Sequence, residues 1–139
     1  MGSDTIKDTS AMIAEMDPLL DPAQWCFVSA SDQGWAFALM PHALSTFREE
    51  EGLSLIVSQE AALEAGIEAD PYCRIKLRIN SALDGVGLTA AVSAALADAR
   101  IACNIVAAYH HDHVFVPAGR AEEALALLIG LSRDKQTIA

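Results

Sequence analysis

Basic side chains, cysteines and long hydrophobic runs are all scarce in this sequence of 139 residues. Nine lysines and arginines stand against nineteen acidic residues, and the net charge of −10 would repel the phosphates of a nucleic acid. No apolar run approaches the roughly 18 residues that cross a membrane, and no basic start followed by an apolar segment marks a signal peptide. We therefore expect neither nucleic acid nor a membrane as a partner.

The three cysteines, Cys26, Cys73 and Cys103, stand singly in apolar segments and show no C-x-x-C spacing. An odd number in such surroundings is typical of buried, reduced thiols, which favours a cytoplasmic protein. No serine or cysteine lies near an evident histidine–acid pair in the sequence. We therefore predict no catalytic residue, no metal site and no cofactor.

What the sequence does contain is apolar residues, at 53%, enough to bury a substantial core. The charge is unevenly distributed: residues 1–70 hold two basic and thirteen acidic side chains, whereas residues 71–139 hold seven and six. This imbalance indicates either two halves that face each other with complementary charge or simply an acidic surface. The acidic run Glu49–Glu51 is accordingly either a solvated strand end or a partner of Arg74, Lys76 or Arg78.

The second half of the sequence alternates between strand and helix patterns. Residues 73–79 place apolar side chains on one face and Arg74, Lys76 and Arg78 on the other, as in a half-buried strand. Residues 88–100 and 118–131 repeat apolar side chains at helical spacing. Residues 102–116, between them, predict two short strands joined by a polar turn. Strand, helix, hairpin and helix make up most of a ferredoxin-like βαββαβ unit.

The first half repeats this order less completely. A short helix is expected to end before Pro18, followed by a strand over 24–30, a hairpin over 44–57 and a helix capped by Ser58. Residues 31–42 are expected to be irregular, with room for one helical turn over 35–40 before Pro41, so that this half lacks a clear first helix.

The residues from 133 onward are expected to be a loose tail, so that the second half lacks its last strand. Either the other half or a second subunit would supply that strand. The predicted fold is α/β (α+β), with two ferredoxin-like halves in tandem, 1–70 and 71–139, and antiparallel sheets with helices on one face.

Five segments of this layout carry a family resemblance: Thr46–Leu53, Gly87–Val92, Cys103–Ala107, His111–Pro117 and Arg120–Ala124. On these segments the sequence resembles the ACT domain family, small βαββαβ modules that bind amino acids and related effectors. More narrowly, it looks like compact bacterial proteins built from two ACT-like halves. The resemblance implies a regulatory protein that binds a small molecule, most simply an amino acid, has no catalysis of its own and forms a homodimer.

In such domains the effector lies where the loop after the first strand meets the second strand, often at an interface between domains. The resemblance therefore implies a site formed by Asp84, Gly85, Val86, Gly87, Leu88, Thr89, Asn104 and Ile105. The residues also support it independently, because the glycines allow a ligand carboxylate to approach the unpaired N–H groups of a helix N-terminus. Asp84 would bind an ammonium group. The alternative is a plain turn between strand and helix, capped by Asp84.

The cluster His110–His113 offers imidazoles and a carboxylate, which are ligands for zinc and other transition metals. Neighbouring residues on a strand point to opposite faces, so all four cannot converge on one ion. We expect a structural hairpin or the rim of a ligand site here. A metal-dependent enzyme that uses this turn, and a dimerising interaction module without a ligand, are the alternative functions.

Overall fold

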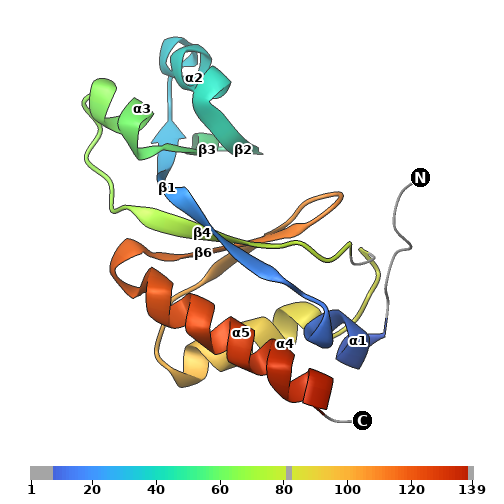
Figure 1. The fold of residues 1–139 in the computed structure, drawn as a ribbon. Coiled ribbons are helices and arrows are strands. Elements are labelled where there is room, and N and C mark those ends of the chain that lie inside the picture. Colours follow the sequence, from blue (N-terminus) through green and yellow to red (C-terminus); the bar gives the residue numbers. More distant parts are fainter. Residues whose placement is uncertain (1–7, 81–82, 138–139) are drawn as a thin grey trace. The chain divides into compact units, whose positions relative to one another are not determined.

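The structure is a computed structural model that describes residues 8–80 and 83–137 (Figure 1). The chain forms two compact units: the described residues up to Asp21 group with those from Arg74 onward, and Pro22–Cys73 form the other unit. The division at 70/71 predicted above concerns the repeat along the sequence, and it stays a prediction. Strand β1 (Pro18–Ala30) begins in the first of these units and ends in the second.

The unit Pro22–Cys73 consists of three antiparallel strands and short helices. After β1 come α2 (Gln33–Leu39), the 3-10 turn η1 (Met40–His42), β2 (Ala43–Glu49), β3 (Gly52–Ser58) and α3 (Gln59–Glu64). The strand order is β2-β3-β1, and Cys26 lies opposite Val57 across the β1–β3 pair. Both side chains are fully buried in a core with Leu55, Leu39 and Ala62.

Helix α2 corrects the expectation that residues 31–42 are irregular. Its N-cap is Asp32, whose carboxylate accepts a hydrogen bond from the Trp35 backbone N–H at 2.8 Å. Among residues 34–39 of this helix, only Leu39 is buried, while Trp35 and Phe37 remain exposed. The helix therefore lacks the apolar stripe by which a sequence pattern identifies a helix. This half does possess its first helix.

The other unit contains a βαββα arrangement after the N-terminal segment. Its elements are α1 (Thr9–Ala14), the start of β1, β4 (Tyr72–Leu77), α4 (Leu88–Asp98), β5 (Asn104–Ala107), β6 (Asp112–Pro117), the 3-10 turn η2 (Ala118–Arg120) and α5 (Ala121–Thr137). The strand order is β1-β4-β6-β5. Helices α4 and α5 lie against one face of β4 and β6 (Figure 1). The buried apolar side chains of the strands and of both helices form the core of this unit.

The fourth strand of this unit comes from the N-terminal segment of the same chain. The Arg78 N–H donates to the Asp17 carbonyl at 3.2 Å, and Arg74 forms an ion pair with Asp21 at 2.8 Å. A second ion pair joins Arg78 to Asp17. The chain is therefore not one strand short, and a missing strand no longer argues for a dimer. These two arginines pair with aspartates rather than with the acidic run Glu49–Glu51.

Helix α5 continues to Thr137, which corrects the expectation of a loose tail after residue 132. The buried Ser132 hydroxyl donates to the Ala14 carbonyl at 2.7 Å and so fixes this end of the helix to α1. Within residues 8–80 and 83–137, no helix combines the length and the apolar character that crossing a membrane requires.

Candidate functional site

The loop before α4 ends in an unusual backbone conformation at Gly87, the N-cap of the helix. Its φ is +106° and its ψ is −20°, a conformation that strongly favours glycine. No side chain caps the helix, and its first helical hydrogen bond runs from the Ala91 N–H to the Gly87 carbonyl at 2.9 Å. The N–H groups of residues 88–90 therefore have no acceptor within the helix, and they carry partial positive charge.

Helix α1 covers one side of this loop. The Thr9 hydroxyl donates to the Val86 carbonyl. A Cβ added to Gly87 would lie 2.6 Å from Thr9 Cγ2 and 3.0 Å from Thr9 Oγ1. The space beside Gly87 that the sequence assigns to a ligand carboxylate is therefore filled by Thr9. Because 77 positions separate Thr9 from Val86, no local pattern signals this contact.

The remaining loop residues differ in what they present to solvent. Asp84, Val86 and Thr89 are exposed, and 76% of Val86 is accessible. Leu88 is only 4% accessible and belongs to the core, so its side chain is not available to a ligand. Gly85 lies partly buried between them. The accessible side of the predicted site therefore combines the exposed side chains of Asp84 and Thr89 with the first backbone amides of α4.

Asn104 and Ile105 point to opposite faces of the sheet. On β5, Asn104 lies opposite Phe115 of β6, whereas Ile105 lies opposite Val114, which is fully buried beneath the helices. Successive strand residues face opposite sides, so Ile105 faces the core and only Asn104 presents an exposed side chain.

Within one chain, Asn104 also lies at the far end of β5 from the loop. The side chain of His111, just before β6, forms a hydrogen bond with the backbone of Arg78, whereas His113 lies near Arg74, whose charge adds to burial in lowering the pKa of His113. The later residue of β6 therefore lies beside the earlier residue of β4. Strand β6 thus runs antiparallel to β4, and β5 runs parallel to it. The loop follows the C-terminal end of β4, whereas Asn104 begins β5, about 10 Å along the strand from that end. The structure does not bring Asn104 to the loop of its own chain.

The histidine turn does not assemble a metal centre in the part of the chain that the structure describes, where no three histidine, cysteine, aspartate or glutamate side chains converge. The turn closes with a hydrogen bond from the Ala108 N–H to the His111 carbonyl at 3.1 Å. Burial lowers the pKa of both His111 and His113, and Lys76 lowers both further. Both rings therefore favour the neutral form more than a free imidazole does.

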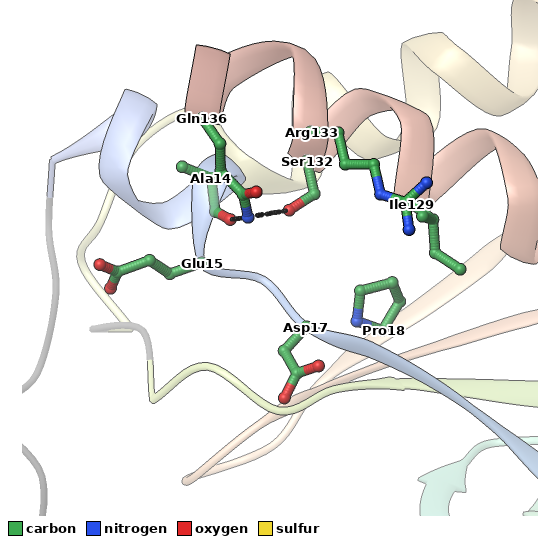
Figure 2. Close-up of a pocket in the computed structure, with 8 residues that line it drawn as sticks. All are labelled: Ala14, Glu15, Asp17, Pro18, Ile129, Ser132, Arg133 and Gln136. Atoms are coloured by element: carbon green, nitrogen blue, oxygen red, sulfur yellow. Dashed lines mark hydrogen bonds between the residues drawn. The ribbon is translucent and has the colours of Figure 1, made fainter. Parts of the chain in front are cut away.

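A cleft of about 400 Å³ lies between the end of α1 and the last turns of α5 (Figure 2). The Gln136 amide nitrogen lies between the Ala14 carbonyl and the Ser132 hydroxyl, at 2.7 Å and 3.4 Å. Arg133 and Ile129 line the other side of the cleft, above Pro18 (Figure 2). The Ala14 carbonyl accepts hydrogen bonds from both Ser132 and Gln136 of α5. These two bonds fix the end of α1, the helix that covers Gly87.

Comparison with known proteins gives two adjoining matches to family models described as ACT domains, one over residues 4–74 and one over residues 71–129. No curated protein matches the sequence. A crystal structure of a protein of unknown function from Vibrio cholerae, described as a possible transport protein, is 36% identical. That match has a TM-score of 0.74 and covers 86% of this chain and 92% of the other.

Two more distant structures share the fold. A protein from Agrobacterium tumefaciens is 23% identical, with a TM-score of 0.62 and coverage of 78% of this chain and 81% of the other. The regulatory subunit of aspartate kinase from Thermus thermophilus is 15% identical, with a TM-score of 0.57 and coverage of 82% and 95%.

Proposed function

This chain belongs to the ACT domain family, and from that premise we propose that it is a regulatory protein that binds a free amino acid or a similar small zwitterion and catalyses no reaction. ACT domains are regulatory, ligand-binding modules, and this chain consists of two of them in tandem. The regulatory subunit of an aspartate kinase, an enzyme of amino-acid metabolism, shares the fold. The three free cysteines agree with a cytoplasmic location.

The observation that carries this proposal is the uncapped N-terminus of α4 behind the loop Asp84–Thr89. Three consecutive backbone N–H groups without helical acceptors suit a carboxylate, because they donate hydrogen bonds from the positive end of the helix dipole. The exposed Asp84 supplies the negative charge that an ammonium group requires. A free amino acid or a similar small zwitterion presents both a carboxylate and an ammonium group, and its remaining atoms then determine which one binds.

Asn104 joins this site, in our proposal, from a second copy of the chain, whereas Ile105, whose side chain faces the core, would contribute only its backbone. Strand β5 is the last strand in its sheet order, so its outer edge has backbone groups to offer to a partner. A two-fold dimer that brings the start of β5 toward the loop of the other copy would complete the predicted pocket. Light scattering at tens of micromolar should therefore report a homodimer, and a monomer would argue against the shared site.

A thermal-shift panel of the free amino acids tests the ligand class. A ligand at about 100 times its dissociation constant adds roughly 2.7 kcal/mol of stability and raises the melting temperature accordingly. Asp84→Asn should weaken binding of the amino acid and leave unchanged the binding of the corresponding carboxylic acid, which lacks the amino group. Asp98→Asn, which removes an equally exposed charge at the other end of α4, is the matched control.

A flat response to every amino acid would instead favour the second candidate, an interaction module without a ligand. Its support is exposed aromatic surface in the unit Pro22–Cys73, where Phe37 and Phe47 are 73% and 72% accessible. Large exposed apolar side chains are typical of protein contact surfaces. A shift with divalent metals alone would favour the metal-dependent alternative at the histidine turn.

A further inference from the structure

We propose that Lys76, His111 and His113 form a second binding site, which takes an oxyanion, the phosphate or carboxylate group of a small molecule. These side chains belong to the sheet face of β4 and β6 that points away from α4 and α5. The site is separate from the loop Asp84–Thr89, and it does not depend on the function proposed above.

The side-chain directions of the two neighbouring strands place these three residues on one face. On β4, Ile75 and Leu77 are buried in the core, so Arg74, Lys76 and Arg78 point to the opposite face. On β6, Val114 and Val116 are fully buried in the core, which sends His113, and His111 two residues before it, to the same opposite face. Strands β4 and β6 are adjacent in the sheet.

Lys76 provides the uncompensated positive charge of this face. The two arginines that flank it on β4 are each held by an aspartate of β1: Arg74 by Asp21 and Arg78 by Asp17, both at 2.8 Å. No ion pair of this kind engages Lys76 within residues 8–80 and 83–137. An anion at Lys76 thus meets a free ammonium group between two neutralised arginines, although the whole chain carries a net charge of −10.

The two histidines provide hydrogen-bonding groups beside that charge. His113 is partly buried, and its Nδ1 atom is buried with no hydrogen-bond partner among the described residues 8–80 and 83–137. Buried polar atoms are nearly always paired with protein, water or a ligand, so this nitrogen is one for which the described part of the chain supplies no partner. Rotation of the ring about its Cβ–Cγ bond redirects the nitrogen, and a bound oxyanion would stabilise the orientation that donates to it.

The charges around the histidines determine how they respond to an anion. Burial lowers the pKa of His113 most, followed by Arg74, Lys76 and His111, and burial lowers that of His111 most, followed by Lys76 and His110. The Arg78 backbone and Asp112 raise the pKa of His111 in partial opposition. A bound oxyanion would offset this positive surrounding and raise both values, so by linkage it must bind more tightly as pH falls.

Sulfate is the probe of choice, because it stays doubly charged where the histidines titrate. We expect histidine ring NMR signals, recorded at constant ionic strength between about pH 6 and pH 8, to show saturable sulfate binding with raised pKa values for His111 and His113. His42, in the other unit, is the internal reference and should not respond. Phosphate and acetate, titrated in parallel, separate a tetrahedral anion from a carboxylate.

Lys76→Gln should weaken binding of the preferred anion at least about tenfold, because it removes the charge and keeps most of the side-chain stem. Lys135→Gln, on α5, removes the same charge elsewhere and should leave the affinity unchanged. The proposal is overturned if neither histidine shows saturable binding of any of the three anions, or if the two variants weaken binding equally. The titration of the unmodified protein alone decides whether the histidines bind an anion, so the test holds even if Lys76→Gln does not fold.

Discussion

Replacing Gly87 with alanine should destabilise the protein by about 2–3 kcal/mol. A residue with a Cβ in a left-handed conformation, such as the φ of +106° here, costs about 1–2 kcal/mol. The new methyl group would also lie 2.6 Å from Thr9 Cγ2, so Thr9 must move and give up its hydrogen bond to Val86. A typical hydrogen bond contributes about 1 kcal/mol, so backbone strain and the lost hydrogen bond together account for about 2–3 kcal/mol.

Urea denaturation of a double-mutant cycle separates the two contributions. Thr9→Ala alone should cost about 1 kcal/mol for the lost hydrogen bond, and Gly87→Ala about 2–3 kcal/mol. In the double variant the displaced side chain is absent, so only the backbone strain adds to the lost hydrogen bond. The double variant should therefore be about as stable as Gly87→Ala alone, with a coupling of about 1 kcal/mol.

Gly66→Ala is the matched control for backbone strain. Gly66 has a φ of +75°, but a Cβ there would meet nothing within 4 Å, so the substitution should cost only the conformational strain of about 1 kcal/mol. If Gly87→Ala were no more destabilising than Gly66→Ala, or if the cycle were additive within about 0.5 kcal/mol, α1 would not cover the loop as described.

Three further predictions concern α5 and the histidines. Ser132→Ala should cost about 1 kcal/mol in urea denaturation, because it removes the buried hydrogen bond to the Ala14 carbonyl, and an unchanged stability would refute that anchor. Gly130→Ala should stabilise the protein by about 0.5–1 kcal/mol, because its Cβ meets open space in the middle of a helix; a loss of stability would mean that this position is crowded. Because burial lowers the pKa of both His111 and His113 in the folded protein, the unfolded chain binds protons first, and the free energy of unfolding should fall as pH drops below about 6.5. His113→Gln should flatten that dependence, and an unchanged slope would contradict it.

The sequence predicted the elements whose pattern is local. Strand β4 alternates strictly between apolar and basic side chains, and α4 and α5 carry apolar stripes, so β4 and α4 were expected close to their observed bounds and α5 was expected as a helix, although it extends to Thr137 rather than ending near residue 131. The β5–β6 hairpin followed from two short apolar runs around a polar turn. These elements, with the family resemblance, were enough to identify the ferredoxin-like fold.

The parts that the sequence did not reveal depend on contacts between distant residues. Helix α2 was missed because most of its face is exposed and offers no periodic signal. For the unit that holds α4 and α5, the sequence left open whether the other half or a second subunit supplies the fourth strand, because that strand precedes the rest of the unit by more than fifty positions; the structure takes it from the other half of the same chain. For the same reason Thr9, which fills the space beside Gly87, lay outside any local pattern.

The loop site was predicted from a glycine pair before a helix, and the structure adds which of its atoms are accessible. The side chain of Leu88 is buried in the core, and Asn104 lies at the other end of β5 from the loop of its own chain. Strand direction decides this separation, and direction is a property of the assembled sheet rather than of the residues alone.

Backbone amide NMR of the protein titrated with each free amino acid tests most directly whether the N-terminus of α4 binds an amino-acid carboxylate. At least one amino acid should saturate, and the largest shifts should fall on the N–H groups of Leu88, Thr89 and Ala90, which have no helical acceptor. Saturable binding that leaves these three amides unmoved, or no binding by any amino acid, would contradict the proposed function.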